Sequence, residues 1–378
     1  MRTEQRVFTG EGGWSAPARR ELASAQLVFV FARGDLLERG DLCGELRQTY
    51  PEASIVGCST AGEIAGTRVL DGSLVATAIR FDSSTARVAM VDLPSAGDCV
   101  EAGRALGCAL PQDGLIHVFV LSEGLAVNGT DLARGLAASL PPGVAVTGGL
   151  SGDAERFERT LVLCGEEARG NRVLAIGLYG SHLRFGFGSL GGWDAFGPMR
   201  RVTRSSGNQL FELDGRPALA LYRQYLGEHA AQLPSSALLF PLLVRPPDGE
   251  SVVVRTVLSV SDADQSMTFA GDVVENAEAQ LMMANFDRLV DGAEGAASRA
   301  HQALAGGSAE LALLVSCVGR KLLLKQRTEE EVEVVRDVLG EGACLAGFYS
   351  YGELCPTAPR TSCELHNQTM TITTLAEA

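Results

Sequence analysis

The residues with the clearest metal-binding chemistry lie near the end of the chain. Cys355, Cys363 and His366 follow one another closely, and Cys344 is nearby. Thiolate and imidazole are ligands that zinc prefers in proteins. However, Cys363 and His366 are three positions apart, which places them on opposite faces of a strand, and no C-x-x-C pair is present. Zinc is therefore the weaker interpretation, and redox-sensitive thiols or a purely structural His366 stay open.

A glycine-rich turn offers a second kind of chemistry. Residues 57–63 read GCSTAGE, and the backbone N–H groups of such a turn could hold an anion. The turn lacks the lysine of a G-x-x-x-x-G-K-[ST] loop and the G-x-G-x-x-G pattern, so it does not indicate a nucleotide site. Ser59, Thr60 and Glu63 are its candidate ligand-pocket residues. The alternative is structural: glycine allows a positive φ, and Glu63 caps the next segment.

Aromatic side chains are sparse but gather in the glycine-rich turns. Trp193, Phe196, Phe348, Tyr349 and Tyr351 lie there and not in the apolar runs. As a group they could line an apolar pocket for a flat ligand, although core packing is the default for each of them.

The sequence gives no positive evidence for an enzyme. Ser122-Glu123-Gly124 follows an apolar run, but no G-x-S-x-G nucleophile turn and no H-E-x-x-H metal motif is present. We therefore expect a protein that is not an enzyme.

The glycine-rich turn belongs to an internal repeat. Residues 51–64, 143–153 and 341–354 share an apolar residue before a glycine and an acidic residue after it. The acidic residues are Glu63, Asp153 and Glu353. Three copies of one acidic turn favour a role in fold geometry first and in a shared pocket second.

Each turn has the same predicted strands and helices before and after it, in the same order. Buried strands are predicted at 27–35, 115–124 and 311–319, followed by helices at 41–49, 131–139 and 328–339, the last with Thr328 and Glu331 as a capping box. After the turns come strands at 73–81, 172–179 and 369–375. The pattern predicts an α/β fold with mixed sheets, built from repeated strand–helix–strand–turn–strand units. Loops at the carboxyl ends of such strands should face a common crevice.

The repeat pattern is interrupted between residues 182 and 228, where we predict the boundary of two domains. The first covers 22–215 and holds two repeat units. The second covers 216–378 and holds one unit, a strand at 251–260 and a helix at 277–305, in which Met282 and Met283 should be core residues. A helix is also expected at 217–226.

The bulk composition excludes several classes of protein. The net charge of −14 over 378 residues argues against nucleic-acid and anionic-membrane surfaces. No signal-peptide pattern and no apolar run of membrane-spanning length is present, so we expect a cytoplasmic protein. The nine cysteines should mostly be buried free thiols.

Several segments resemble the FIST family of bacterial signal-transduction sensors. They are GCSTAGEI, FAGDVVENAEAQLMMAN, AGFYSYGEL, LHNQTMTITTL and the connection at 192–222. The stand-alone arrangement is similar to the NosP-type members, haem proteins that sense nitric oxide and act on a separate histidine kinase or cyclic-di-GMP enzyme. Other members were proposed to bind amino acids. The resemblance implies a cytoplasmic sensor that could form a homo-oligomer.

The resemblance also implies particular residues. His366, in the LHNQTM motif, would be the axial ligand of a b-type haem, and Phe348, Tyr349 and Tyr351 would line its slot. Without haem, a sensor of amino acids or other small metabolites would use the turns. Its pocket candidates are Ser59, Thr60, Glu63, Trp193, Glu353 and Asn367. Of the other histidines, His117 should be a core residue, His182 is a weak second candidate for ligation, and His229 and His301 should face solvent.

Overall fold

The computed structural model describes the chain except residues 11, 94–97, 234, 248–251 and 305. It confirms an α/β fold with mixed sheets built from repeated units. The first unit consists of β3 (Leu27–Ala32), α2 (Gly40–Thr49), β4 (Ser54–Ser59), β5 (Glu63–Ala65), β6 (Arg68–Leu70) and β7 (Ser73–Arg80). Its first strand is buried along its whole length, as its unbroken apolar run LVFVFA predicts.

The other two units repeat this order. The second consists of β9 (Leu115–Ser122), α4 (Gly129–Ser139), β10 (Ala145–Leu150), β11 (Val162–Cys164), β12 (Glu167–Arg169) and β13 (Arg172–Tyr179). The third consists of β24 (Leu311–Cys317), α8 (Glu330–Leu339), β25 (Cys344–Ser350), β26 (Gly352–Pro356), β27 (Cys363–His366) and β28 (Met370–Glu377). In every unit the two strands joined by the helix are parallel, and the last strand is antiparallel to the first.

The units are interlocked by exchange of their hairpins. The β5–β6 hairpin of the first unit pairs with β25 of the third, β11 of the second pairs with β4 of the first, and β26 of the third pairs with β10 of the second. The strands β8 (Thr85–Asp92), β14 (Leu183–Leu190) and β1 (Arg2–Thr9) complete the edges against β13, β28 and β7. The body therefore has pseudo-three-fold symmetry. The sequence pattern missed these hairpins because their strands are only three to five residues long.

Helices cover the outer faces of the sheets. In the second unit α3 (Cys99–Ala109) packs on α4, and two glycines allow the backbones to approach closely. A Cβ atom on Gly103 would lie 2.3 Å from the carbonyl oxygen of Leu132, and one on Gly135 would lie 2.0 Å from that of Val100. In the third unit α6 (Phe286–Ala303) packs on α8.

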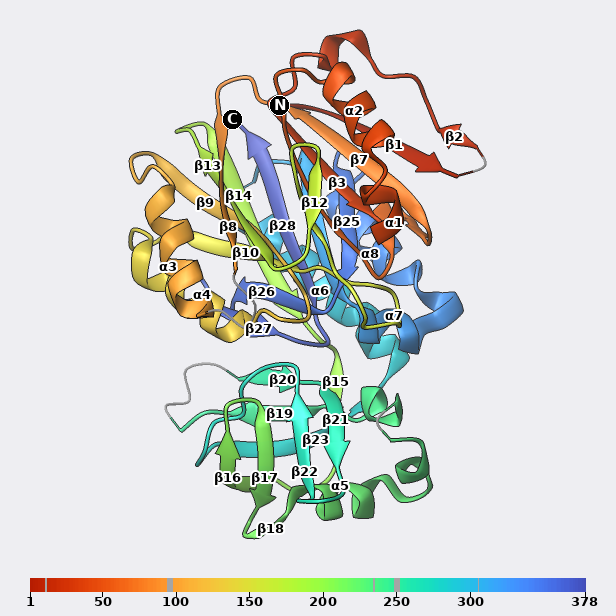
Figure 1. Ribbon diagram of the computed structural model, residues 1–378, viewed down its shortest axis with the longest axis vertical. Coiled ribbons are helices and arrows are strands. Elements are labelled where there is room, and N and C mark those ends of the chain that lie inside the picture. The colour runs from red at the N-terminus through yellow and green to blue at the C-terminus, as the bar shows by residue number, and fades with distance from the viewer. Residues whose placement is uncertain (11, 94–97, 234, 248–251, 305) are drawn as a thin grey trace.

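A smaller lobe is inserted between the second and third units. Figure 1 shows it below the body, formed mainly by α5 (Ala218–Leu226) and the strands between β15 (Trp193–Ala195) and β23 (Glu278–Ala284). It has its own apolar core. The remaining strands of the lobe are β16 (Arg200–Ser206), β17 (Gln209–Leu213), β18 (Arg216–Pro217), β19 (Leu242–Arg245), β20 (Val253–Arg255), β21 (Val257–Ser261) and β22 (Ser266–Phe269).

The division in space differs from the predicted division of the sequence. The boundary between 215 and 216 falls inside the lobe, between β17 and β18, which pair with each other. The third unit, placed in the second domain, shares sheets with the first two. Strands from the segments 22–215 and 216–378 therefore share sheets, because the hairpins cross between units.

Three local predictions need correction. The helix expected at 277–305 begins only at Phe286, because residues 278–284 form a strand that pairs with β19 and β15. Residue 305 lies outside the described part. Met283 is consequently exposed, whereas Met282 is buried. The strand expected at 251–260 is two strands, and residue 251 is not described. Thr328 and Glu331 form no capping box, since Glu331 points into the core.

Candidate functional site

The three glycine-rich turns meet in a closed ring of backbone hydrogen bonds. In each unit the glycine of the turn, Gly57, Gly148 or Gly347, stands beside the first strand of that unit. The amide four residues later donates to the carbonyl oxygen two residues after the glycine of another unit. The bonds run from Ala61 to Tyr349 (2.8 Å), from Tyr351 to Leu150 (3.2 Å) and from Gly152 to Ser59 (2.9 Å). The loops at the carboxyl ends of these strands therefore meet at one place.

Two of the acidic turn residues hold the same network. The Glu63 carboxylate accepts from the hydroxyl of Thr60 (2.5 Å) and from the amide and hydroxyl of Ser73 (3.0 and 2.7 Å). The Glu353 carboxylate accepts from the Ser350 hydroxyl (2.7 Å) and from the amide and hydroxyl of Thr369 (3.1 and 2.8 Å). Each therefore ties its turn to the start of the last strand of its unit.

Burial dominates the electrostatics of these carboxyl groups. Both side chains are about 1% exposed or less, and loss of hydration raises the pKa of Glu63 and raises that of Glu353 to about 8. Asp153 differs, because its carboxylate pairs with Arg156 and accepts from the amide of Arg159 at 3.2 Å.

A cleft of about 710 Å³ opens beside the turn of the first unit. We call it the charged cleft. It lies where that turn, the 154–156 segment of the second unit, and α7 (Val318–Leu324) with the residues after it come together. Its lining includes the predicted Thr60 and Glu63. The remaining lining residues are Arg33, Ala61, Gly62, Asp71, Gly72, Ala154, Glu155, Arg156, Val318, Lys321, Leu322, Lys325 and Thr328. Ser59 is fully buried, and its hydroxyl accepts from the Leu161 amide.

Charged groups of both signs face this cleft. The Lys321 ammonium donates to the carbonyl oxygen of Ala61 at 2.9 Å and pairs with Asp71. Lys325 and Glu155 are exposed and have no ion-pair partner among the residues that the structure describes. The cleft therefore presents an ammonium group already held at the central turns, together with a cation and an anion that are not neutralised.

Arg320 and Glu331 are functional candidates that the sequence interpretation missed. Both are fully buried, and the Arg320 guanidinium binds the Glu331 carboxylate at 2.8 and 3.0 Å. Glu331 also accepts from Ser316 (3.0 Å) and from the Tyr349 hydroxyl (2.6 Å). One sequence signal could have revealed this site. Arg320 and Lys321 come three and four residues after the end of the buried strand β24, and charged residues so close to a buried strand end need partners.

Arg320 also holds the two connections to the inserted lobe. Its guanidinium donates to the carbonyl oxygen of Gly191 (2.5 Å), where the chain leaves the body, and to that of Leu289 (2.6 Å), just after it returns. Since Lys321 is the next residue, α7 links the charged cleft to both connections.

His366 does not occupy a site that fits haem. It is 6% exposed, its Nε2 lies 2.9 Å from the carbonyl oxygen of Cys355, and it sits on β27 opposite Glu353. Burial lowers its pKa to about 4. The neighbouring Asn367 amide donates to the His366 carbonyl oxygen at 3.0 Å. The Nε2 atom is therefore held by a backbone carbonyl oxygen in an almost fully buried side chain, and we derive no chemistry through haem here.

The aromatic residues expected around haem are dispersed. The Phe348 ring packs on Phe31 in the core at 4.8 Å between centroids, and Tyr349 is bound to Glu331. The Trp193 indole donates to the carbonyl oxygen of Gln368 at 2.9 Å. Phe196 lies in the lobe. Tyr351, two residues after Tyr349, stacks instead on Phe157 at 4.2 Å between ring centroids. The structure does not bring them to one pocket.

The metal alternative gains no support. Among the described residues no three His, Cys, Asp or Glu side chains are placed to hold a metal ion. Cys363 and His366 lie on one strand three positions apart, as expected. All nine cysteines are free, and burial raises the pKa of Cys355 and Cys363, which makes them poor thiolates.

The other histidines are placed largely as expected. His117 is fully buried, with Nε2 2.9 Å from the Thr147 hydroxyl, and burial lowers its pKa to about 3. His182 contacts the carbonyl oxygen of Ala378 at the surface. His229 is exposed, whereas His301 is half-buried.

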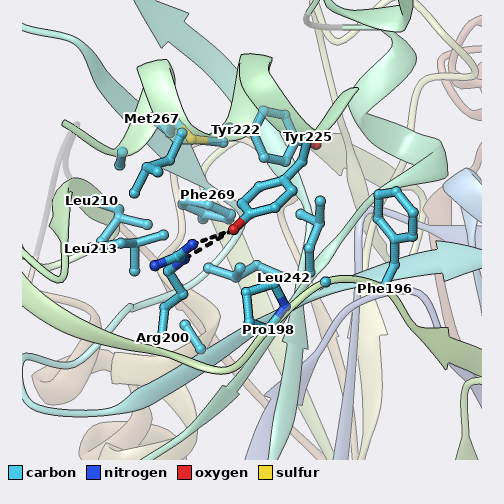
Figure 2. A pocket seen from close by; sticks show the side chains of 15 residues that line it. Phe196, Pro198, Arg200, Leu210, Leu213, Tyr222, Tyr225, Leu242, Met267 and Phe269 are labelled. Carbon is cyan, nitrogen blue, oxygen red and sulfur yellow. Dashed lines mark hydrogen bonds between the residues drawn. The ribbon is translucent and has the colours of Figure 1, made fainter. Parts of the chain in front are cut away.

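The lobe contains a small apolar cavity of about 20 Å³ (Figure 2). Arg200 is the charged residue of its lining, and its guanidinium donates to the hydroxyl of Tyr225. A volume of this size holds roughly one water molecule. The cavity is therefore a packing feature of the lobe in this conformation.

Comparisons with known proteins cover most of the chain. Residues 26–216 match the model of the FIST N domain, and residues 218–356 match that of the FIST C domain. No curated protein matches the chain. A solved structure, the cyanuric acid hydrolase from A. caulinodans, aligns with 99% of both chains at 10% identity and a TM-score of 0.37. A score this low carries no argument about activity. Within the described residues, no helix is long and apolar enough to cross a lipid bilayer.

Proposed function

Because this chain belongs to the FIST family, whose domains are associated with signal-transduction sensing and ligand binding, we propose that its ligand is a small zwitterion of the amino-acid class. The observation that carries the proposal is the charged cleft. It lies against the ring where all three turns meet, and it presents cations and anions together. Its volume falls in the range of small-molecule sites.

The geometry suggests how each end of such a ligand is held. A carboxylate would replace Asp71 at the Lys321 ammonium, which keeps its bond to the carbonyl oxygen of Ala61. Lys325 supplies a second cation. Glu155 offers a carboxylate for the ammonium end of the ligand. A ligand with one charge alone would form only part of these ion pairs and should bind more weakly.

A route for the signal follows from α7. A ligand that moves Lys321 also moves Arg320, whose guanidinium holds Gly191 and Leu289 at the two connections to the lobe. Ligand binding would therefore change how the lobe is held against the body. The expected partner, a histidine kinase or a cyclic-di-GMP enzyme, would respond to that change.

Haem and nitric oxide remain predictions from the resemblance alone. The buried, hydrogen-bonded His366 gives them no support, and a binding role without catalysis agrees with the sensory character of the family.

Thermal unfolding of the whole protein in the presence of single amino acids and short peptides tests the proposal. A ligand at a hundred times its Kd should stabilise the protein by about 2.7 kcal/mol, measured as an increase in Tm. N-acetylated amides of the same amino acids, which lack both charges, should have no effect. Lys321→Met should abolish the shift, and Lys325→Met and Glu155→Gln should weaken it.

A matched control is Arg216→Gln, which removes a charge from an exposed residue of the lobe that does not line the cleft. It should respond like the unchanged protein. Absence of stabilisation by every compound, or a shift that survives Lys321→Met, would refute the proposal.

A further inference from the structure

The pseudo-three-fold symmetry creates equivalent grooves around the central ring. Each groove lies between the segment that follows the first strand of one unit and the turn of the next. In the charged cleft these are α7 and the turn of the first unit. The equivalent groove of the second unit lies between residues 124–129 and Tyr351 of the third. At the equivalent position between the first and second units, Arg159 pairs with Glu38, the residue that follows α1 (Gly34–Leu37).

The second groove is a cavity of about 300 Å³ that the inserted lobe covers. We call it the interdomain cavity. Leu258, Asn208 and residues 269–271 close it from the lobe, while the body supplies residues 124–129, Leu150, Phe157, Tyr351 and Leu365. Both bodies therefore contribute to one site, which is a preferred location for ligands.

The residues that line this cavity are uncharged, in contrast to those of the charged cleft, and Phe157, Phe269 and Tyr351 among them are aromatic. A carboxylate lies behind the lining, where Asp272 accepts from the side-chain amide of Asn128 at 3.3 Å. The Phe157 and Tyr351 rings are stacked at 4.2 Å with an interplanar angle of 13°. Phe157 is nonetheless 43% exposed, and Leu125 and Leu258 are 42% and 46% exposed. Large apolar side chains that converge on one uncharged hollow mark a binding surface.

The backbone fixes the Phe157 ring in place. Phe157 has a positive φ of 54°, which is unfavourable for a bulky residue and is held by its surroundings. Its amide donates to the Tyr351 hydroxyl (3.2 Å), which donates in turn to the carbonyl oxygen of Ala154 (3.2 Å). Tyr351 therefore holds the strained loop so that an aromatic ring is presented at the cavity.

From these observations we infer that the interdomain cavity is a second binding site, for a neutral small molecule with a flat aromatic ring. The ring would pack against Phe157 from the body and Leu258 from the lobe. Asn128 and Asn208 are the polar side chains at its rim. The ligand would join the two bodies directly, and it needs neither Lys321 nor any other residue of the charged cleft.

A matched pair of neutral probes tests the site on the whole protein. Benzamide and cyclohexanecarboxamide share an amide and differ in the aromatic ring. Saturation-transfer NMR should show benzamide binding clearly more strongly. Phe157→Ala and Leu258→Ala should each lower the affinity for benzamide by roughly three- to tenfold, the size expected for loss of one stacking or packing contact. Both residues are exposed, so folding should be retained.

Hydrogen exchange supplies a second readout, and Met90→Ala is the control because Met90 is equally exposed but lies on β8. Benzamide should slow exchange on both sides of the cavity, at 124–129 and at 269–271, and Met90→Ala should leave binding unchanged. Four results would overturn the inference. They are equal binding of the two probes, no binding of either, binding that Phe157→Ala and Leu258→Ala leave unchanged, and protection on one side of the cavity only. None of these results depends on the charged cleft.

Discussion

The amide of Ala61 donates to the carbonyl oxygen of Tyr349 at 2.8 Å, which joins the first repeat unit to the last. Two equivalent bonds close the ring through the second unit. Since each unit also lends a hairpin to another, no unit has a complete sheet of its own. The body should therefore unfold as one cooperative structure, and the turns at its centre should be the places least tolerant of change.

Gly57→Ala should destabilise the body strongly. A Cβ atom there would lie 1.9 Å from the carbonyl oxygen of Val30 on the neighbouring parallel strand, and backbone cannot move aside cheaply. We expect a loss of more than about 2 kcal/mol in the free energy of unfolding, measured by urea denaturation. Gly44→Ala, in α2 with open space around it, should instead stabilise by about 0.5–1 kcal/mol. Equal effects of the two changes would contradict this account of the turn.

Glu353→Gln should weaken the dependence of the free energy of unfolding on pH. Burial raises the pKa of Glu353 to about 8, so the folded protein keeps a proton that the unfolded chain has released above pH 4.5. Stability is therefore greatest below that pH and falls as pH rises through about 8, by at most about 1.4 kcal/mol per pH unit. The glutamine amide can still accept from Thr369 and donate to Ser350.

The measurement is urea unfolding of both proteins from pH 5 to pH 8. The decline should be shallower for Glu353→Gln, and Glu63→Gln should act in the same direction because burial also raises the pKa of Glu63. Glu52→Gln, at an exposed position, is the control and should leave the slope unchanged. Parallel profiles for Glu353→Gln and the unchanged protein would show that Glu353 is ionised when buried.

Arg320→Met should cost about 3–5 kcal/mol, because it leaves the Glu331 carboxylate buried without its cation. Adding Glu331→Gln should recover part of the loss, so the two changes together cost less than their sum. Limited proteolysis should also show faster cleavage near 191–193 and 285–289, since both connections lose their contact with Arg320. Arg39→Ala breaks a surface pair with Asp41 and should change little. Additive losses would mean that Arg320 and Glu331 act independently.

The strands and helices of the repeat could be predicted because each is a continuous local pattern. The run RVLAIGLY forms β13 from Arg172 to Tyr179 as expected, and the amphipathic helix at 131–139 is α4 from Gly129. The run EAQLMMA was mistaken for helix, because its alternation is weak and its strand character comes from pairing with β15 and β19. Pairing partners distant in sequence decide such short segments.

The site was harder to predict because it lies between units. Thr60 and Glu63 were recognised from the turn, but Lys321 reaches them from α7, which the repeat pattern did not include. Tyr351 was recognised as an aromatic turn residue, whereas its partner Phe157 lies in a segment without periodicity. The exchange of hairpins brings these residues together, and no local pattern encodes that exchange.

His366→Ala provides the test of the haem prediction. His366 is almost fully buried and its Nε2 is bound to the carbonyl oxygen of Cys355, so ligation of iron through Nε2 would have to break that hydrogen bond. We therefore expect haemin added to the purified protein to give no Soret band that depends on His366. The absorption spectra of the unchanged protein and of His366→Ala should coincide, while Tm falls in the variant through loss of a buried side chain. A Soret band present in the protein and lost in His366→Ala would establish ligation and would contradict the expectation that this site does not take up haem.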